Sequence, residues 1–200
     1  MPPKVKITKE EIVNVALSLV RERGEQTLNA RSIAAKLHCS TQPIFSNFAT
    51  MDDLQQATLA AAHAYYLSFL QAEIERGRYP PYKSMGMAYI RFAKEEKELF
   101  RLLFLCDRTE KEQTPTADFE ASIELIRQAN RVSRERAERM HLEMWSCVHG
   151  IGTMLATSFL SLDWELISDV LSDVYTGIQT KYLSAKDTEE SNDERTVQGH

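Results

Sequence analysis

Few residues in this 200-residue sequence interrupt regular structure, since it contains only 7 glycines and 6 prolines. Sandwiches and barrels need frequent turns, and turns depend on these two residue types. The long stretches are instead rich in Ala, Leu, Glu, Lys, Arg and Gln, which favour helices. The sequence therefore predicts an all-α protein of about nine helices.

Cysteine is also scarce. Cys39, Cys106 and Cys147 include no C-x-x-C pair, and an odd number argues against a closed disulfide framework. No apolar signal segment is recognisable near residue 1. The charge-free run 144–162 holds too many Ser, Thr and His residues for a membrane span, so we expect a buried or subunit-facing helix there. We expect a cytoplasmic protein with reduced thiols and no membrane partner, and leave open whether Cys106 senses redox state.

The motifs of metal-dependent and nucleotide-dependent enzymes are missing as well. The sequence contains no H-E-x-x-H, G-x-G-x-x-G or G-x-x-x-x-G-K-[ST]. The stretch DDLQQ at Asp52 does not complete a D-D-x-x-D magnesium motif, because Gln56 occupies its last position. His141 and His149 are two helical turns apart, too far for one metal without further ligands. We therefore expect no enzymatic activity, no cofactor and no metal site, and keep a helical enzyme as the remote alternative.

Capping residues mark the ends of the predicted helices. Thr8 and Glu11 fit the capping box, and Gly24 stands where a C-cap residue is wanted. The side chains expected to cap later helices are those of Asn29, Ser40, Thr50 and Asp163. The predicted helices cover residues 8–23, 29–37, 40–48, 50–76, 82–95, 96–105, 118–131, 134–160 and 163–183.

Charge is unevenly distributed along the chain. Residues 1–51 hold seven Lys or Arg and four Glu, a net charge of +3, and the other residues hold 17 basic and 25 acidic residues, a net charge of −8. A basic head on an acidic body suggests that a polyanionic partner binds near the N-terminus. We predict a helix-turn-helix domain at 1–50, a helical domain at 51–184, and a disordered tail at 185–200 that lacks apolar anchors.

Residues 28–48, LNARSIAAKLHCSTQPIFSNF, contain two short predicted helices joined by a turn at His38 and Cys39. This arrangement matches the helix-turn-helix pattern, whose second helix enters the major groove of DNA. Gln suits paired bonds to adenine, and Ser or Thr bonds to several base edges. The base-reading candidates are Thr41, Gln42, Ser46 and Asn47. An ordinary packed corner of three helices is the alternative interpretation of the same pattern.

The second of these helices has its own expected packing. Pro43 falls in its first turn, where the missing N–H is tolerated. Ile44, Phe45 and Phe48 are expected to face inward. Since the helix has no Lys or Arg, phosphate contacts must come from elsewhere, such as Arg31, Lys36, the N-terminal lysines and the helix N-termini.

Residues 8–59 resemble the DNA-binding domain of the tetracycline-repressor (TetR) family of transcriptional regulators. The similarity rests on ITKEEIVNVALSLVRERGEQTLNARSIAAKLHCSTQPIFSNF followed by ATMDDLQQA. Farther along, YIRFAKEEKELFRLLF and MWSCVHGIGTML resemble the so-called WHG C-terminal domain, with Trp145, His149 and Gly150 in a W-x-x-x-H-G pattern. The resemblance covers residues 8 to about 183.

The resemblance implies an all-helical homodimer whose N-terminal heads bind a near-palindromic operator in double-stranded DNA. It also implies a small-molecule effector in the body, pairing of the last two long helices as a four-helix dimer bundle, and release of DNA when the effector binds. The implied role is that of a repressor. The DNA-binding candidates are Asn29, Ala30, Arg31, Ser40, Thr41, Gln42, Phe45, Ser46, Asn47 and Met51.

Three positions depart from the family pattern. Phe45 stands where such regulators commonly have a Tyr whose hydroxyl meets a phosphate, Met51 where they have a Lys, and His38 where Gly is usual. Two lost phosphate contacts predict weaker binding with a flatter salt dependence. They also leave open a second hypothesis, a regulator that has lost DNA binding and acts through a protein partner.

An effector pocket is expected to be apolar with a few polar groups. The candidate lining residues are Tyr66, Tyr89, Phe92, Phe100, Phe104, Met140, Met144, Trp145 and His149. Each of them also fits an ordinary core, and we expect His149 to bond a neighbouring helix rather than an effector. Gly150 and Gly152 are expected to permit the close approach of another helix.

Overall fold

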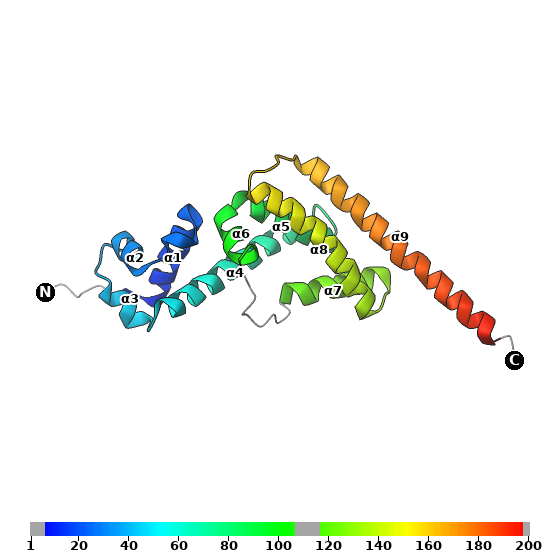
Figure 1. Cartoon of the computed structure of the whole chain (residues 1–200), viewed down its shortest axis with the longest axis horizontal. Helices are drawn as coiled ribbons and strands as arrows, with labels where there is room; N and C mark the ends of the chain where they lie inside the picture. Colours follow the sequence, from blue (N-terminus) through cyan, green and yellow to red (C-terminus); the bar gives the residue numbers. More distant parts are fainter. Residues whose placement is uncertain (1–6, 107–116, 198–200) are drawn as a thin grey trace. The chain divides into compact units, whose positions relative to one another are not determined.

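The structure, a computed structural model, describes residues 7–106 and 117–197 (Figure 1). Within these residues it consists of nine α-helices and one short 3₁₀ helix, without strands, which confirms the predicted all-α class. The elements are α1 (Lys9–Arg23), η1 (Glu25–Thr27), α2 (Ala30–Lys36), α3 (Gln42–Asn47), α4 (Met51–Glu75), α5 (Pro81–Glu95), α6 (Lys97–Phe104), α7 (Ala117–Asn130), α8 (Arg134–Ala156) and α9 (Trp164–Val197). Most of the predicted loop between α6 and α7 lies outside the described residues.

The described chain divides into two compact units. Unit 1 holds residues up to Ala72 together with those from Arg91 to the end of α6, and unit 2 holds Glu73–Ile90 together with α7, α8 and α9. Unit 1 therefore extends beyond the domain predicted at 1–50. The reason is that α1 packs against α6 as well as against α2 and α3.

The first helix has the ends that the sequence predicts. The Glu11 N–H donates to the Thr8 hydroxyl at 3.1 Å, and the Thr8 N–H donates to the Glu11 carboxylate at 2.7 Å, which completes the capping box. At the other end Gly24 has φ +85°, and its N–H bonds to the Val20 carbonyl at 2.7 Å. A side chain at Gly24 would collide with Gln26 and Glu98, so only glycine fits here.

The turn between α2 and α3 is formed by His38, which has φ +52° in the left-handed region. Asn29 caps α2 as predicted, accepting from the Ser32 N–H at 2.9 Å. The expected cap at Ser40 is wrong, because α3 begins at Gln42 after Thr41, and no side chain caps it. Pro43 has no N–H to offer, and the Ile44 N–H already bonds to the Thr41 carbonyl at 3.1 Å.

One side of α3 faces the core of unit 1. Ile44 and Phe48 are buried, but Phe45 is 50% exposed, so the prediction that all three face inward is wrong for Phe45. Residues one turn apart share a helix face, whereas the next residue points about 100° away. Burial of Ile44 and Phe48 therefore turns Phe45 toward solvent.

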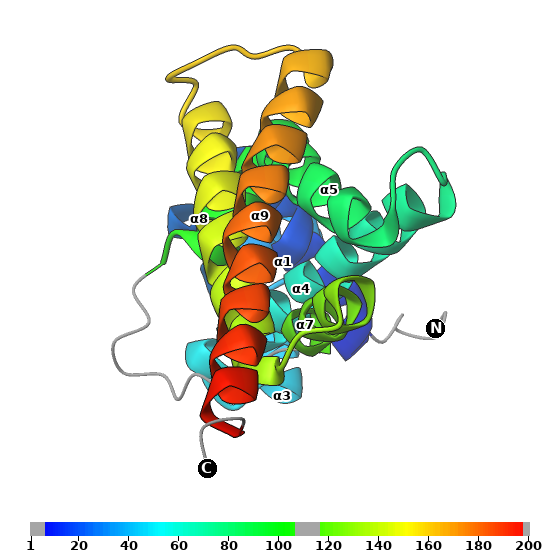
Figure 2. The same cartoon turned by 90° about the vertical axis from the view of Figure 1, so that its right-hand side faces the viewer.

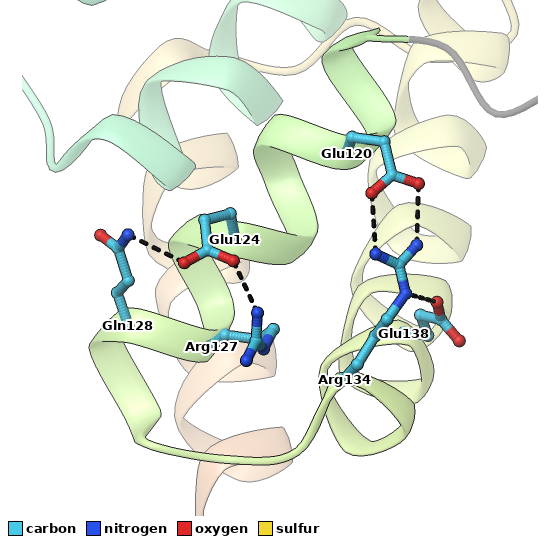
Figure 3. Close-up of polar contacts among 6 residues, drawn as sticks. All are labelled: Glu120, Glu124, Arg127, Gln128, Arg134 and Glu138. Atoms are coloured by element: carbon cyan, nitrogen blue, oxygen red, sulfur yellow. Dashed lines mark hydrogen bonds and ion pairs between the residues drawn. The ribbon is translucent and has the colours of Figure 1, made fainter.

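An exposed network of ion pairs joins α7 to α8 in unit 2 (Figure 3). Arg131 ends α7 with φ +54°, and Ser133 caps α8 by accepting from the Arg136 N–H at 3.3 Å. Arg134 donates to both carboxylate oxygens of Glu120, at 2.9 and 2.8 Å, and to Glu138 at 2.8 Å. Exposed pairs contribute little stability, so the backbone of Arg131 and the Ser133 cap account for the turn better than this network does.

The last two helices run antiparallel and side by side, as Figures 1 and 2 both show. The predicted cap at Asp163 is confirmed, because its carboxylate accepts from the Leu166 N–H at 2.7 Å. Helix α8 ends at Ala156, four residues before the predicted end, where Ser158 takes φ +58°. Helix α9 continues to Val197, so the tail predicted at 185–200 is helical up to that residue.

None of the helices in the described residues combines the length and the apolar character needed to cross a bilayer.

Gly86 allows α5 to approach α8 and α9 closely. A Cβ atom at this position would lie 3.3 Å from Cγ2 of Val148 and 3.6 Å from Cδ1 of Leu171. The close approach expected at Gly150 does not occur within the described residues of this chain, since a Cβ atom there would meet none of their atoms within 4 Å. Gly152, one turn after Val148, is buried on the inner face of α8.

We predict that Gly86→Leu destabilises the protein by about 1–3 kcal/mol, because the added side chain overpacks the contact with Val148 and Leu171. The free energy of unfolding in urea measures this effect. The matched variant Gly150→Ala adds a methyl group in open space within a helix, and is expected to raise stability by up to about 1 kcal/mol. Equal stabilities for the two variants would contradict the packing described for Gly86.

Candidate nucleic-acid interface and ligand-binding residues

Some side chains on the exposed side of α3 form hydrogen bonds within the protein, and others do not. The Ser46 hydroxyl donates to the Gln42 carbonyl at 2.9 Å. The Asn47 amide donates to the carbonyls of Pro43 at 2.8 Å and Ile7 at 3.3 Å. Among the described residues the Gln42 side chain, which is exposed, makes no hydrogen bond, and the hydroxyl of Thr41 caps nothing. The donor groups of Ser46 and Asn47 thus hold α3 together, and Thr41 and Gln42 remain available for base edges.

The start of α2 offers groups for phosphate contacts. Asn29 is exposed, but its carboxamide is engaged by the Ser32 N–H and by the Thr27 carbonyl at 3.2 Å. Ala30 is half-buried, and Arg31 is exposed without an ion pair in the part of the chain that the structure describes. Arg31 is therefore the cation of α2 that is available to a polyanion.

Lys36, at the end of α2, is engaged within unit 1. Its ammonium donates to the Glu22 carboxylate at 2.6 Å and to Ser18 at 3.1 Å. The hydrogen bond from Lys36, followed by that from Ser18, lowers the pKa of Glu22. Lys36 therefore links α2 to α1, and its charge is partly offset before any contact with DNA.

Two further candidates flank α3. Ser40 is exposed in the turn before the helix, and Met51 is the half-buried first residue of α4. The Thr50 hydroxyl accepts from the Asp53 N–H at 3.1 Å, which confirms the predicted cap of α4. Met51 brings no positive charge to this helix N-terminus, and Asp52 and Asp53 stand in its first turn, so a phosphate here would meet backbone N–H groups beside two carboxylates.

A carboxylate within unit 1 joins three helices. Glu96 is 7% exposed and accepts from Arg21 Nε at 2.6 Å, from Arg21 Nη2, and from the Tyr65 hydroxyl at 3.0 Å. It stands at the N-cap position of α6, yet its side chain does not cap that helix. The hydrogen bond to Glu96 raises the pKa of Arg21, and burial, followed by the hydrogen bond to Glu96, raises the pKa of Tyr65. No spacing in the sequence pairs residues so far apart, and our sequence analysis missed this cluster.

Four of the predicted ligand-binding residues meet within unit 1. The Tyr66 ring contacts Phe92 and Phe104 edge to face, at centroid distances of 5.2 and 5.1 Å, and Phe100 lies 5.3 Å from Phe104. Tyr66, Phe92 and Phe100 are buried, and Phe104 is half-buried. The structure thus brings these four aromatic side chains into one closely packed cluster.

The other candidates lie in unit 2. The Tyr89 hydroxyl and Nδ1 of His149 are joined by a hydrogen bond of 2.7 Å, so His149 bonds a neighbouring helix as expected. The Trp145 ring stacks on His149 at 4.7 Å with an interplanar angle of 19°. Burial lowers the pKa of His149. Met140 and Met144 are buried, whereas Trp145 is 41% exposed.

His141 is a second half-buried histidine, and the sequence analysis, which weighed it only as a metal ligand, did not predict its partners. Its Nδ1 is 3.0 Å from the Tyr82 hydroxyl, and its ring meets Phe119 edge to face at 5.3 Å. Burial lowers the pKa of His141, against a smaller opposing effect of Asp118. Burial also raises the pKa of Tyr82. The imidazole therefore remains neutral at physiological pH.

The three cysteines are free thiols. Burial raises the pKa of Cys147, which keeps this thiol protonated and less reactive. Cys39 and Cys106 are half-buried free thiols. In the described parts of the chain no three His, Cys, Asp or Glu side chains gather to hold a metal ion.

Comparison with known proteins identifies relatives of this fold. Residues 82–173 match the family described as "Tetracyclin repressor-like, C-terminal domain". The chain is similar to the crystal structure of the multidrug binding protein EbrR complexed with imidazole, at 19% identity over 83% of this chain and 88% of that chain, with a TM-score of 0.57. It is also similar to a TetR-family member from Streptomyces coelicolor A3, at 19% identity over 83% and 96% of the two chains, with a TM-score of 0.56. The search of curated proteins gave no match.

We predict that Glu96→Ala lowers the free energy of unfolding by about 1–3 kcal/mol, because the Tyr65 hydroxyl and the Arg21 guanidinium lose a charged acceptor. Arg21 is half exposed and can turn to water, which favours the lower end of this range. Urea denaturation gives the value. The control Glu138→Ala removes an exposed partner of Arg134 and is expected to cause no measurable loss. A loss no larger than that of the control would show that Glu96 does not hold unit 1 together.

A second prediction concerns pH. Burial depresses the pKa of His141 and His149 in the folded protein, so the unfolded chain binds protons more readily as the pH falls below about 6.5. Stability should therefore be fully present above this pH and decrease below it. Unfolding free energies measured between pH 8 and pH 5.5 test this. The double variant His141→Asn with His149→Asn keeps a polar group near each tyrosine hydroxyl and should flatten the decrease. Rising stability on acidification of the unmodified protein would contradict the prediction.

Proposed function

We propose that the chain is a TetR-family repressor that binds a palindromic operator as a homodimer, because residues 82–173 match a tetracyclin repressor-like C-terminal domain and the fold is similar to that of a TetR-family member. The family match groups the chain with transcriptional regulators rather than with enzymes. In this proposal residues 1–50 form the DNA-binding domain, residues 51–184 bind a small-molecule effector and dimerise, and the protein acts in the cytoplasm.

The observation that carries the proposal is the exposed start of α3. Thr41 and Gln42 stand at its N-terminal end with side chains that no intramolecular hydrogen bond engages. The N-terminal residues of a recognition helix are those that reach base edges in the major groove. Arg31 and the N-termini of α2 and α4 supply phosphate contacts around them. The net charge of +3 on residues 1–51 favours the same polyanionic partner.

Dimerisation is supported by apolar side chains exposed on unit 2. They lie on α8, on the connection after it, and on the first turn of α9, the two helices that run side by side in Figure 2. These residues are Leu142, Trp145, Phe159, Leu160 and Leu166, with exposed fractions of 61, 41, 75, 43 and 47%. Exposed apolar surface marks interaction sites when it is contiguous, and we propose that these residues contribute to one such surface. A dimer would also supply the two heads that successive major grooves, roughly 34–36 Å apart, require.

An effector site in the body is supported by aromatic residues within each unit taken by itself. Unit 1 offers the cluster around Tyr66, and unit 2 offers Tyr89, Trp145 and His149. Aromatic walls with few polar groups suit small, largely apolar organic molecules. EbrR, a neighbour in fold, is described as a multidrug binding protein. We propose that such a ligand releases the operator by changing the spacing of the heads.

The experiment that tests the function is a mobility shift of the full chain on DNA flanking its own gene, at two salt concentrations. A discrete complex that resists competitor DNA and weakens with salt supports the proposal. The variant Gln42→Ala serves as the control for specific contact, since loss of its carboxamide should weaken discrimination at one base pair. A sedimenting dimer that shifts no DNA at low salt would overturn the proposal and favour a regulator acting through a protein partner, in line with Phe45 and Met51.

We predict that Leu142→Glu weakens dimerisation about a hundredfold, because an unpaired carboxylate must leave water when the subunits associate. Sedimentation velocity over a range of concentrations measures the dissociation constant. Gln128→Glu adds the same charge on the exposed side of α7 and should leave the dimer intact. If the two variants sediment alike, the subunit interface lies elsewhere.

A further inference from the structure

Phe45 is an exposed aromatic side chain in the middle of the proposed recognition helix. Its ring is 50% exposed, and it makes no ring contact or cation contact within the described residues. Single exposed apolar residues are common on protein surfaces, so exposure alone carries no conclusion. What distinguishes Phe45 is the set of side chains around it on α3.

Three side chains of α3 and its N-cap make no intramolecular hydrogen bond among the described residues: those of Thr41, Gln42 and Phe45. Phe45 lies one helical turn after Thr41 and three residues after Gln42, so these residues adjoin on the exposed side of the helix. The Ser46 hydroxyl and the Asn47 amide donate to backbone carbonyls instead. Thus α3 presents one free carboxamide, one hydroxyl with a methyl group, and one apolar ring.

This combination distinguishes among base pairs. A phenyl ring has neither a hydrogen-bond donor nor an acceptor, so it cannot bind a phosphate. Against the polar edge of a G·C pair it would displace water from base groups that it cannot bond, which is unfavourable. Thymine is the base that presents an apolar group, its 5-methyl, in the major groove. A Gln carboxamide pairs with N6 and N7 of adenine. The side chains of α3 therefore suit consecutive A·T pairs.

We propose that Phe45 is a specificity-determining residue that contacts the 5-methyl group of a thymine in each half-site, next to the adenine bonded by Gln42. This proposal rests on the proposed function. It gives Phe45 a contact with a base in place of the phosphate contact implied for a Tyr at this position. The part of the affinity for DNA that comes from this apolar contact then depends on the base sequence and not on the salt concentration.

The test uses the full chain and the duplex that it selects from a randomised library. Each thymine of the duplex is replaced in turn by deoxyuridine, which lacks the methyl group, in both half-sites. At one position per half-site this replacement should weaken binding about fourfold for each methyl group removed. In Phe45→Ala the same replacement should have no effect. Because the Phe45 ring is half exposed, this variant is expected to fold, and Phe45→Leu, which retains apolar bulk, should keep part of the sensitivity.

Thr41→Ser is the matched control, since it removes a neighbouring methyl group and leaves Phe45 in place. Sensitivity at the Phe45 position should persist in this variant. Three outcomes would overturn the proposal while DNA binding stands. Thr41→Ser could lose the sensitivity to deoxyuridine, or Phe45→Ala could be as sensitive to it as the unmodified protein. The third outcome is that replacement of no thymine weakens binding. Failure of the unmodified protein to select any duplex would overturn it together with the proposed function.

Discussion

The buried carboxylate of Glu96 is the interaction on which unit 1 depends most. It receives the guanidinium of Arg21 from α1 and the hydroxyl of Tyr65 from α4, and it lies where α6 begins. A carboxylate taken out of water is costly unless its oxygens are fully bonded, and these two partners meet that requirement. Glu96 serves this contact instead of capping its own helix. The helix-turn-helix segment is thereby fastened, through α1, to helices that come later in the chain.

Local signals predicted a large part of the fold. The caps at Thr8, Asn29, Thr50 and Asp163 are visible in the sequence because each bond spans only three residues. The cap at Ser40 failed for a reason that is also local, since backbone bonds had already satisfied the first turn of α3. Phe45 was placed inward because apolar residues usually are, whereas the spacing of Ile44 and Phe48 decides the buried face.

The candidate sites were predicted less completely, because they depend on residues far apart in the chain. Tyr89 and His149 were each selected from the sequence, but their hydrogen bond follows from the packing of α5 against α8. The role of Gly86 likewise depends on which residues of α8 and α9 face it, and no pattern in one segment reveals that. The pairing of Arg21 with Glu96 carries no signature at all, since charged residues are common on both helices.

The stacking of Trp145 on His149 makes part of unit 2 visible to spectroscopy. The chain has 2 tryptophans, and this one is half exposed among the apolar residues proposed to meet a second subunit. Indole emission moves to shorter wavelength when water leaves the ring, and a protonated imidazole in contact with the ring quenches it. The molecule thus contains an intrinsic fluorescent reporter of the charge of His149 and of any partner that covers Trp145, without any added label.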